Sequence, residues 1–219
     1  KPFKLPVTDG SGNNRAQLRT ALGLFEKAGW HVKGMRLVDP GGQQMRFTIL
    51  LDDPSLERVA LPYAENLKHL GIAVDVRTVD PAQFQHLLDD FNYDMTMMVY
   101  PESDTPGNEL TGYFSCASAR AQGSMNLAGA CDPAVDALIG KVVSAADRTS
   151  LGTAVRALDR VLLWRYYLVP NWGSQAFHIA YWDRFGHPEK PIRDGFDFDL
   201  WWTDTARATA TDVARKSGG

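Results

Sequence analysis

The fold is decided by residues 45–79, MRFTILLDDPSLERVALPYAENLKHLGIAVDVRTV, in which two strand-like segments flank a helical pattern. Met45–Leu51 and Ile72–Val79 have the composition of strands. Between them, Pro54 suits the first turn of a helix, and apolar residues recur at helical spacing until Gly71 ends the pattern. This strand–helix–strand order predicts an α/β layer with at least one right-handed crossover.

Further elements extend this layer in both directions. Pro40-Gly41-Gly42 is a turn signal, and it predicts a hairpin between a strand at 35–38 and the strand at 45–51. The other expected elements are a turn and helix over 8–29, a short helix over 81–90, a strand buried on both faces over 94–100, and helices over 132–146 and 149–167. The residues alone therefore predict the α/β class.

Residues 101–131 are rich in Gly, Ser, Asn and Ala, and no regular element is expected there. A structureless loop of that length is uncommon in a compact domain and is usually functional. Its first part follows the carboxyl end of a strand, where α/β sheets present ligand contacts. Polar and acidic side chains at that point suit an amine or a peptide backbone, and the candidate binding residues are Tyr100, Glu102, Ser103, Asp104 and Asn108. An ordinary surface loop is the alternative.

Two cysteines, Cys116 and Cys131, flank a Gly- and Ser-rich stretch. A disulfide between them would stabilise the fold by about 3 kcal/mol through chain entropy. Two separate buried thiols are the alternative, and the spacing leaves both open. A zinc site is disfavoured because no second cysteine pair and no nearby histidine complete a set of four ligands.

Composition and motifs exclude several functional classes. The chain has 219 residues with 23 Lys and Arg against 26 Asp and Glu, a net charge of −3, and the two signs are interspersed. No basic stripe favours nucleic acid or an anionic membrane as a partner. The five histidines form no H-E-x-x-H motif, and no nucleophile elbow or acid–base pair is visible. The sequence therefore predicts neither an enzyme nor a cofactor.

The aromatic residues are concentrated near the end of the chain. Five of the six tryptophans follow residue 163, namely Trp164, Trp172, Trp182, Trp201 and Trp202. This segment has little regular structure with which to bury them. It is therefore expected either to wrap around the α/β layer or to belong to a neighbouring domain that the chain does not contain.

Motifs in a fixed order along the chain resemble those of one protein family. They are PVTDGSGNN at 6–14, GIAVDVRTVDPAQ at 71–83, FNYDM at 91–95, SDTPGNE at 103–109, DPAVDALI at 132–139, RALDRVLLW at 156–164 and AYWDRFG at 180–186. Over residues 6–203 the chain is similar to the family 5 extracellular solute-binding proteins of ABC importers. Within that family it resembles the branch that takes up oligopeptides and microcin C-like peptides.

The resemblance implies a fold and a domain organisation. Members of this family are much longer than 219 residues and have two lobes around a ligand cleft. Residues 1–169 are then expected to form the second lobe, a type II periplasmic-binding-protein-like lobe with a mixed sheet flanked by helices. Residues 170–205 would be the crossover and the segments of the first lobe, which is absent here, and 206–219 a flexible tail.

The resemblance also implies a function without catalysis. The protein would bind an oligopeptide or peptide-like solute between its lobes and deliver it to ABC permease subunits at the membrane. It would be periplasmic, exported by a signal peptide that is not present in this chain. Two alternatives remain: a hydrolase that uses acidic residues of the 101–109 loop, and a solute-binding fold reused as a sensor or chaperone.

Individual residues take roles from the family pattern. In peptide-binding relatives an aspartate after the equivalent strand pairs with the N-terminal amine of the peptide. Counting back from the loop proline places Glu102 there, and Asp104 is near enough to act instead. Asn126 matches the usual Asn before the Asp-Pro helix and is expected to brace the loop or line the cleft. Cys116 and Cys131 depart from the pattern, and an oxidising periplasm would make them a staple for the cleft loop.

Overall fold

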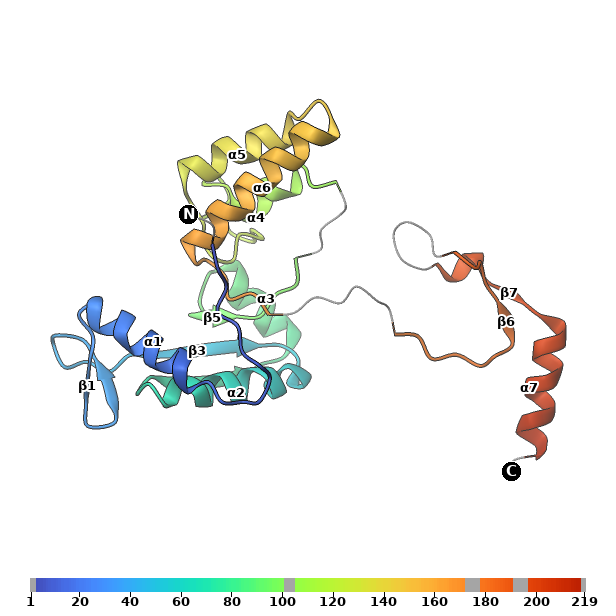
Figure 1. Cartoon of the computed structure of the whole chain (residues 1–219), viewed down its shortest axis with the longest axis horizontal. Helices are drawn as coiled ribbons and strands as arrows, with labels where there is room; N and C mark the ends of the chain where they lie inside the picture. Colours follow the sequence, from blue (N-terminus) through green and yellow to red (C-terminus); the bar gives the residue numbers. More distant parts are fainter. Residues whose placement is uncertain (1–2, 101–104, 172–177, 191–196, 218–219) are drawn as a thin grey trace. The chain divides into compact units, whose positions relative to one another are not determined.

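A computed structural model describes residues 3–100, 105–171, 178–190 and 197–217. The chain divides into two compact units, Lys1–Leu168 and Val169–Gly219 (Figure 1), and each is described by itself. The first unit contains the sheet and the helices that the sequence predicts. Within the described ranges, no helix combines the length and the hydropathy that crossing a bilayer requires.

Three parallel strands form the sheet at the centre of the first unit. The strands are β3 (Arg46–Leu51), β4 (Ala73–Thr78) and β5 (Met95–Thr96), in the order β4-β3-β5. β3 and β4 pair along their whole length, from Arg46 with Ala73 to Leu51 with Thr78. This arrangement confirms the predicted α/β layer, because parallel neighbours need a crossover and the predicted helix supplies it.

Aspartates cap the helical segments that connect the strands of the sheet. Asp53 accepts a hydrogen bond from the Ser55 N–H at the start of η1 (Pro54–Leu56), and α2 (Glu57–Lys68) follows directly. Asp80 caps α3 (Pro81–Asp89) in the same way. These caps satisfy N–H groups that have no partner within the helix. α2 then buries Ala60 against Ile49 and Leu51 of β3, which forms one part of the core.

The sequence predicts a hairpin in which residues 35–38 pair with 45–51, and this pairing is wrong. β2 (Arg36–Val38) pairs in antiparallel fashion with β1 (His31–Lys33), a strand that the sequence did not suggest. A single isolated bridge, Val38 with Gln44, is what remains of the expected pairing. The reason is Gly34, whose φ of +50° allows a two-residue turn much tighter than the loop at 39–43.

α1 (Arg15–Lys27) confirms the helix that the periodicity predicts within 8–29, and it packs on the β1–β2 hairpin. Its apolar residues pack on Leu37, which is fully buried, and on Leu70 and Ile72. The close approach of the chain at Gly71 completes the contact, because the Gly71 carbonyl accepts a hydrogen bond from the Leu37 N–H.

The strand predicted over 94–100 is shorter and less buried than expected. Only Met95 and Thr96 are in the strand, both are half-buried, and Val99 is 83% exposed. In the described part of the chain β5 pairs with β3 alone, so its other edge has no neighbour. The apolar sequence therefore indicates a strand correctly. Among the described residues, however, no second neighbouring strand buries it.

Helices form the rest of the first unit. α5 (Pro133–Val143) and α6 (Arg148–Arg165) pack side by side (Figure 1) and confirm the two predicted helices. Their shared core also contains a short helix, α4 (Glu109–Phe114), within the stretch predicted to lack regular structure. The buried residues of this core include Leu110, Phe114, Val135, Ile139 and Leu158.

The second unit combines a small hairpin with a helix. β6 (Phe185–Gly186) pairs with β7 (Trp202–Thr203), η2 (Phe198–Leu200) lies between them in sequence, and α7 (Thr205–Ser217) follows. The helix corrects the expectation of a flexible tail over 206–219. Its Arg215 guanidinium lies 5.0 Å from the centre of the Trp182 ring, a cation–π contact between the helix and the segment that precedes β6.

Candidate functional site

The candidate site begins at Tyr100, four residues after the end of the strand β5. The Tyr100 ring lies 5.1 Å from that of Tyr113 in an edge-to-face arrangement and 5.5 Å from that of Phe114, on which it stacks. Tyr113 and Phe114 are buried in α4, so this aromatic cluster fixes the start of the 101–109 loop to the helical core. Burial, with a contribution from Tyr113, raises the pKa of the Tyr100 phenol above its ordinary value. The group is therefore neutral at physiological pH.

The polar candidates of the loop are only partly described. Glu102, Ser103 and Asp104 lie outside the described residues. Asn108 is exposed at the N-cap of α4, and its side chain makes no capping hydrogen bond. Its amide is therefore not committed to the helix that it precedes.

The loop closes onto α4 through a short contact next to Asn108. Glu109 Oε1 accepts a hydrogen bond of 2.7 Å from the Gly107 N–H. This bond ties the end of the loop to the first turn of α4, as the aromatic cluster ties its beginning.

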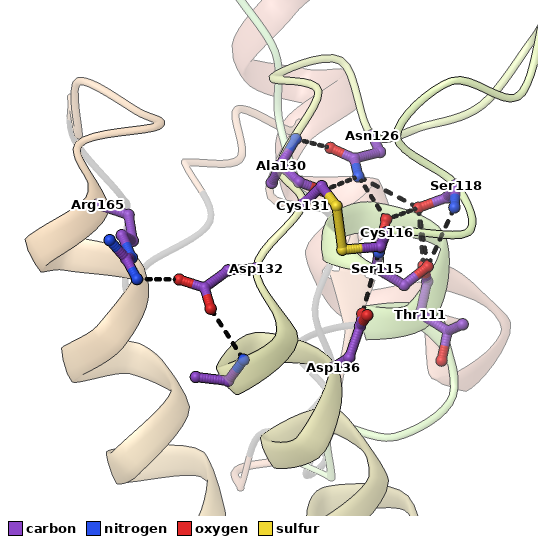
Figure 2. The surroundings of a disulfide bond; sticks show 11 residues. Thr111, Ser115, Cys116, Ser118, Asn126, Ala130, Cys131, Asp132, Asp136 and Arg165 are labelled. Atoms are coloured by element: carbon purple, nitrogen blue, oxygen red, sulfur yellow. Dashed lines mark hydrogen bonds and ion pairs between the residues drawn. A yellow bond between two sulfur atoms is a disulfide. The ribbon is translucent and has the colours of Figure 1, made fainter.

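A disulfide joins the two ends of the following segment (Figure 2). Cys116 and Cys131 are bonded, and their Cα atoms are 4.1 Å apart. The Cys116 N–H also donates to Asp136 Oδ1 at 3.0 Å, which links the start of the segment to the first turn of α5. The segment between α4 and α5 is thus held at its base by a covalent and a polar contact.

Asn126 is the centre of this segment and is fully buried. Its Nδ2 donates to the carbonyl oxygens of Ser115 and Ala130 at 3.0 and 2.8 Å and to Ser118 Oγ at 3.2 Å. Its Oδ1 accepts from the Ala130 N–H at 2.8 Å (Figure 2). Of the two roles expected for this residue, the structure places it in the bracing position, because no part of the side chain reaches the surface.

An ion pair at the start of α5 was not anticipated from the sequence. Asp132 caps α5 by accepting from the Ala134 N–H at 2.8 Å, and its second oxygen pairs with Arg165 at the end of α6. The Asp132 side chain is 9% exposed, whereas that of Arg165 is 54% exposed. The Asp-Pro signal reveals the cap, but no spacing rule connects positions 132 and 165.

A shallow polar depression on the sheet was also missed. Its lining residues come from β3, β4 and the turn after α3, and they are Thr48, Leu50, Arg77, Phe91, Asn92, Tyr93 and Asp94. Asp94 is engaged there, since its Oδ2 accepts from the Thr48 N–H at 2.9 Å. Tyr93 donates its hydroxyl hydrogen to the Leu127 carbonyl at 2.7 Å, and burial, with a smaller effect of Tyr100, raises its pKa to about 12.

The described residues form no cluster that could hold a metal ion. Among them, no three His, Cys, Asp or Glu side chains converge on a point where a metal ion could be held. What the described residues present is Tyr100 packed on α4 and, from Gly107 onward, a chain bonded to the first turn of that helix with the exposed Asn108 beside it. Such an arrangement suits the binding of a polar ligand by hydrogen bonds and charge.

Residues 2–121 match the family described as bacterial extracellular solute-binding proteins, family 5 Middle. The chain belongs to the family 5 bacterial extracellular solute-binding proteins. The resemblance drawn from the sequence motifs is therefore confirmed.

Relatives of this family 5 chain match it over nearly its whole length. It is 45% identical over 207 residues to the uncharacterized protein y4wM of Sinorhizobium fredii, which covers 94% of this chain and 31% of that protein. It is 40% identical over 206 residues to the probable peptide-binding protein YejA of Agrobacterium fabrum, covering 93% and 34%. The chain thus spans about a third of the length of the curated relatives that it matches.

Solved structures confirm the fold class of the family 5 chain. The oligopeptide-binding protein AppA of Bacillus subtilis, determined in complex with a nonapeptide, superposes with a TM-score of 0.66 over 94% of this chain and 40% of that one. The sequence identity is 17%, so this likeness concerns the fold alone.

Proposed function

We propose that the family 5 chain is part of the substrate-binding component of an ABC importer, and that its ligand is an oligopeptide or a peptide-like solute. The observation that carries this proposal is the family match over residues 2–121. The peptide-binding name of the Agrobacterium relative supports the ligand class. The protein reaches the periplasm through export by a signal peptide, and it binds the ligand there. It then delivers the ligand, unchanged, to the permease subunits.

The proposed lobes follow the expected domain limits. Residues 1–169 form one lobe, 170–205 contain the crossover and segments that belong to the other lobe, and 206–219 end the chain. The division of the chain into compact units at Leu168 and Val169 supports a boundary at this point. Tight binding then needs the longer protein, since the cleft lies between two lobes.

The proposed contacts with the ligand lie in the anchored loop. Glu102 or Asp104 pairs with the peptide's N-terminal amine, and Ser103 and Asn108 bond to its backbone, which is the recognition of an extended strand. Tyr100, which packs on Tyr113 and Phe114 just before the loop, is the remaining proposed contact with the ligand. The exposed, uncommitted amide of Asn108 supports a role in binding over one in capping.

Peptide binding by the longer protein tests this proposal, with the 219-residue chain measured in parallel. Peptides of three to nine residues carry a fluorophore at the C-terminus and either a free or an acetylated N-terminus. Anisotropy should report binding by the longer protein and much weaker binding by this chain, and mass spectrometry should recover intact peptide. Hydrolysis would overturn the proposal in favour of a hydrolase, and binding of no peptide would overturn the ligand class.

Charge-neutral variants of the longer protein test the amine contact. Glu102→Gln or Asp104→Asn should weaken binding of free-amine peptides at least tenfold, since it removes a charge-assisted hydrogen bond. Binding of acetylated peptides should hardly change. Glu26→Gln, an exposed carboxylate on α1, is the matched control. If both loop variants bound free-amine peptides as tightly as the wild-type protein does, the amine contact would be contradicted. The proposal of peptide binding would still stand.

A further inference from the structure

Two apolar side chains, those of Val32 and Met35, are exposed at the turn of the β1–β2 hairpin. Gly34 and Met35 are the two central residues of its turn, and the positive φ of Gly34 suits the first position of a two-residue hairpin turn. Met35 is 93% exposed and Val32 is 50% exposed. An almost fully exposed methionine gains nothing from the folded state by burial, so its position calls for another explanation.

Basic residues surround these two apolar side chains. Residues 15–36 contain five Lys or Arg and one Glu, although the whole chain has a net charge of −3. Lys27, Lys33 and Arg36 are exposed, and among the described residues none of the three forms an ion pair. Arg36 donates to the neutral side chain of Gln44 at 3.0 Å. The average composition conceals this local excess, which is why the sequence did not favour an anionic partner.

The base of the hairpin holds the tip firmly in place. Leu37 of β2 is fully buried under α1, and the Trp30 N–H donates to the Phe25 carbonyl at 2.9 Å where the helix ends. Val32 pairs with Leu37 across the two strands. The exposed tip is therefore carried on a packed base and is not a loose end of the chain.

We propose that the hairpin tip, defined as Val32, Lys33, Met35 and Arg36, docks on an anionic membrane surface. Apolar side chains between cations enter the headgroup region while the cations attract acidic lipids. A stable protein interface would need about 800 Å² from each partner and central aromatic anchors. These four residues are the strand ends and one residue of the turn, and none of them is aromatic. These features fit a lipid surface better than an acidic protein.

Sedimentation with vesicles tests this proposal on the 219-residue chain. Vesicles of phosphatidylcholine with phosphatidylglycerol are compared with vesicles of phosphatidylcholine alone, at low and high salt. The chain should bind the anionic vesicles preferentially, and salt should weaken that binding. Equal binding to both kinds of vesicle, or binding to neither, would overturn the proposal.

Two variants and a matched control assign the effect to the tip. Each basic residue near an anionic surface changes the partition coefficient by about fivefold. Lys33→Glu combined with Arg36→Glu should therefore weaken binding by about 25-fold or more, and Met35→Ser should weaken it severalfold with an unchanged salt dependence. Arg156→Glu with Arg160→Glu makes the same charge change on exposed positions of α6 and should have little effect.

Several results of this comparison would overturn the proposal. They are wild-type binding by the Lys33/Arg36 variant, an equal loss in the α6 control, and binding only to vesicles that contain the permease, which would indicate an acidic protein partner. Circular dichroism and thermal unfolding show that each variant folds. None of these results bears on peptide binding, so the two proposals fail separately.

Discussion

Asn126 and Ala130 are hydrogen-bonded in both directions. The Asn126 amide nitrogen donates to the Ala130 carbonyl and its oxygen accepts from the Ala130 N–H, each at 2.8 Å. A side-chain amide thus pairs with a backbone unit as another backbone unit would. Because Ala130 is also fully buried, this pair satisfies polar groups that water does not reach.

Removing this amide should destabilise the protein strongly. Asn126→Ala leaves the buried N–H and carbonyl of Ala130 without a partner, whereas the Ser115 carbonyl keeps the Ala119 N–H, so we expect the free energy of unfolding to fall by about 2–4 kcal/mol. Urea unfolding measures the change. Asn108→Ala, at an exposed cap position without a side-chain bond, should change it by less than about 0.5 kcal/mol. Equal effects of the two substitutions would contradict the bracing role.

The disulfide should be detectable by its protection from alkylation. Under denaturing conditions without reductant, the intact mass should show no added label, and after reduction it should show two. Reduction should lower the free energy of unfolding by about 3 kcal/mol, because the closed loop spans a sequence separation of 15. Two labels before reduction would mean that the cysteines are free thiols.

The ion pair between Asp132 and Arg165 should be worth more than a surface pair. Arg165→Gln leaves a buried carboxylate without its cation and should cost about 2 kcal/mol of the free energy of unfolding. Arg46→Gln breaks the pair with Asp75, in which both side chains are more than half exposed, and should cost less than about 1 kcal/mol. Thermal and urea unfolding of both variants provide the comparison, and a reversed order would refute it.

Gly71 should not tolerate any side chain. Its φ is +84°, and a Cβ atom would lie 2.5 Å from the backbone nitrogen of Leu37. Gly71→Ala should therefore lower the free energy of unfolding by at least about 2 kcal/mol. Gly112→Ala is the control, since no atom lies within 4 Å of its Cβ position in α4, and alanine should raise helix stability by roughly 0.5–1 kcal/mol.

Tyr93 should make the fold sensitive to alkaline pH. Its folded-state pKa of about 12 exceeds the ordinary value of 10. Its contribution to stability is therefore complete below pH 10 and declines as the pH rises toward 12, because the unfolded chain loses the proton first. Tyr93→Phe should lose this part of the pH dependence. The difference in tyrosinate absorbance between the two proteins during titration should show a midpoint near 12, and a midpoint near 10 would contradict the burial.

Periodicity and caps were sufficient to predict most elements of the first unit. Asp80-Pro81 and Asp132-Pro133 mark helix starts that the structure confirms, because an aspartate before a proline supplies both the cap and a compatible first turn. Strand composition also identified β3 and β4. These signals are local, so a short window of sequence contains all of the information.

Pairing partners and burial could not be predicted in the same way. The choice of β1 over β3 as the partner of β2 depends on a single glycine, and the exposure of Val99 depends on a missing neighbour of β5. For the candidate site, the family motif marked Asn126, but the bonds to Ala130 and Ser115 become visible only once the loop is folded. The Asp132–Arg165 pair joins two helices, and no local pattern announces it.

The parallel order of the sheet has a consequence for the newly made chain. The central strand, RFTILL at 46–51, precedes both of its partners, and Leu50 meets Thr96 only 46 residues later. Its first partner, β4, begins at Ala73, so until residues 73–78 are made this short, β-prone and mostly apolar segment has no strand beside it, and its second edge stays open until Thr96. The segment is therefore prone to aggregate before folding is complete, and a chaperone that holds the chain unfolded would protect it there.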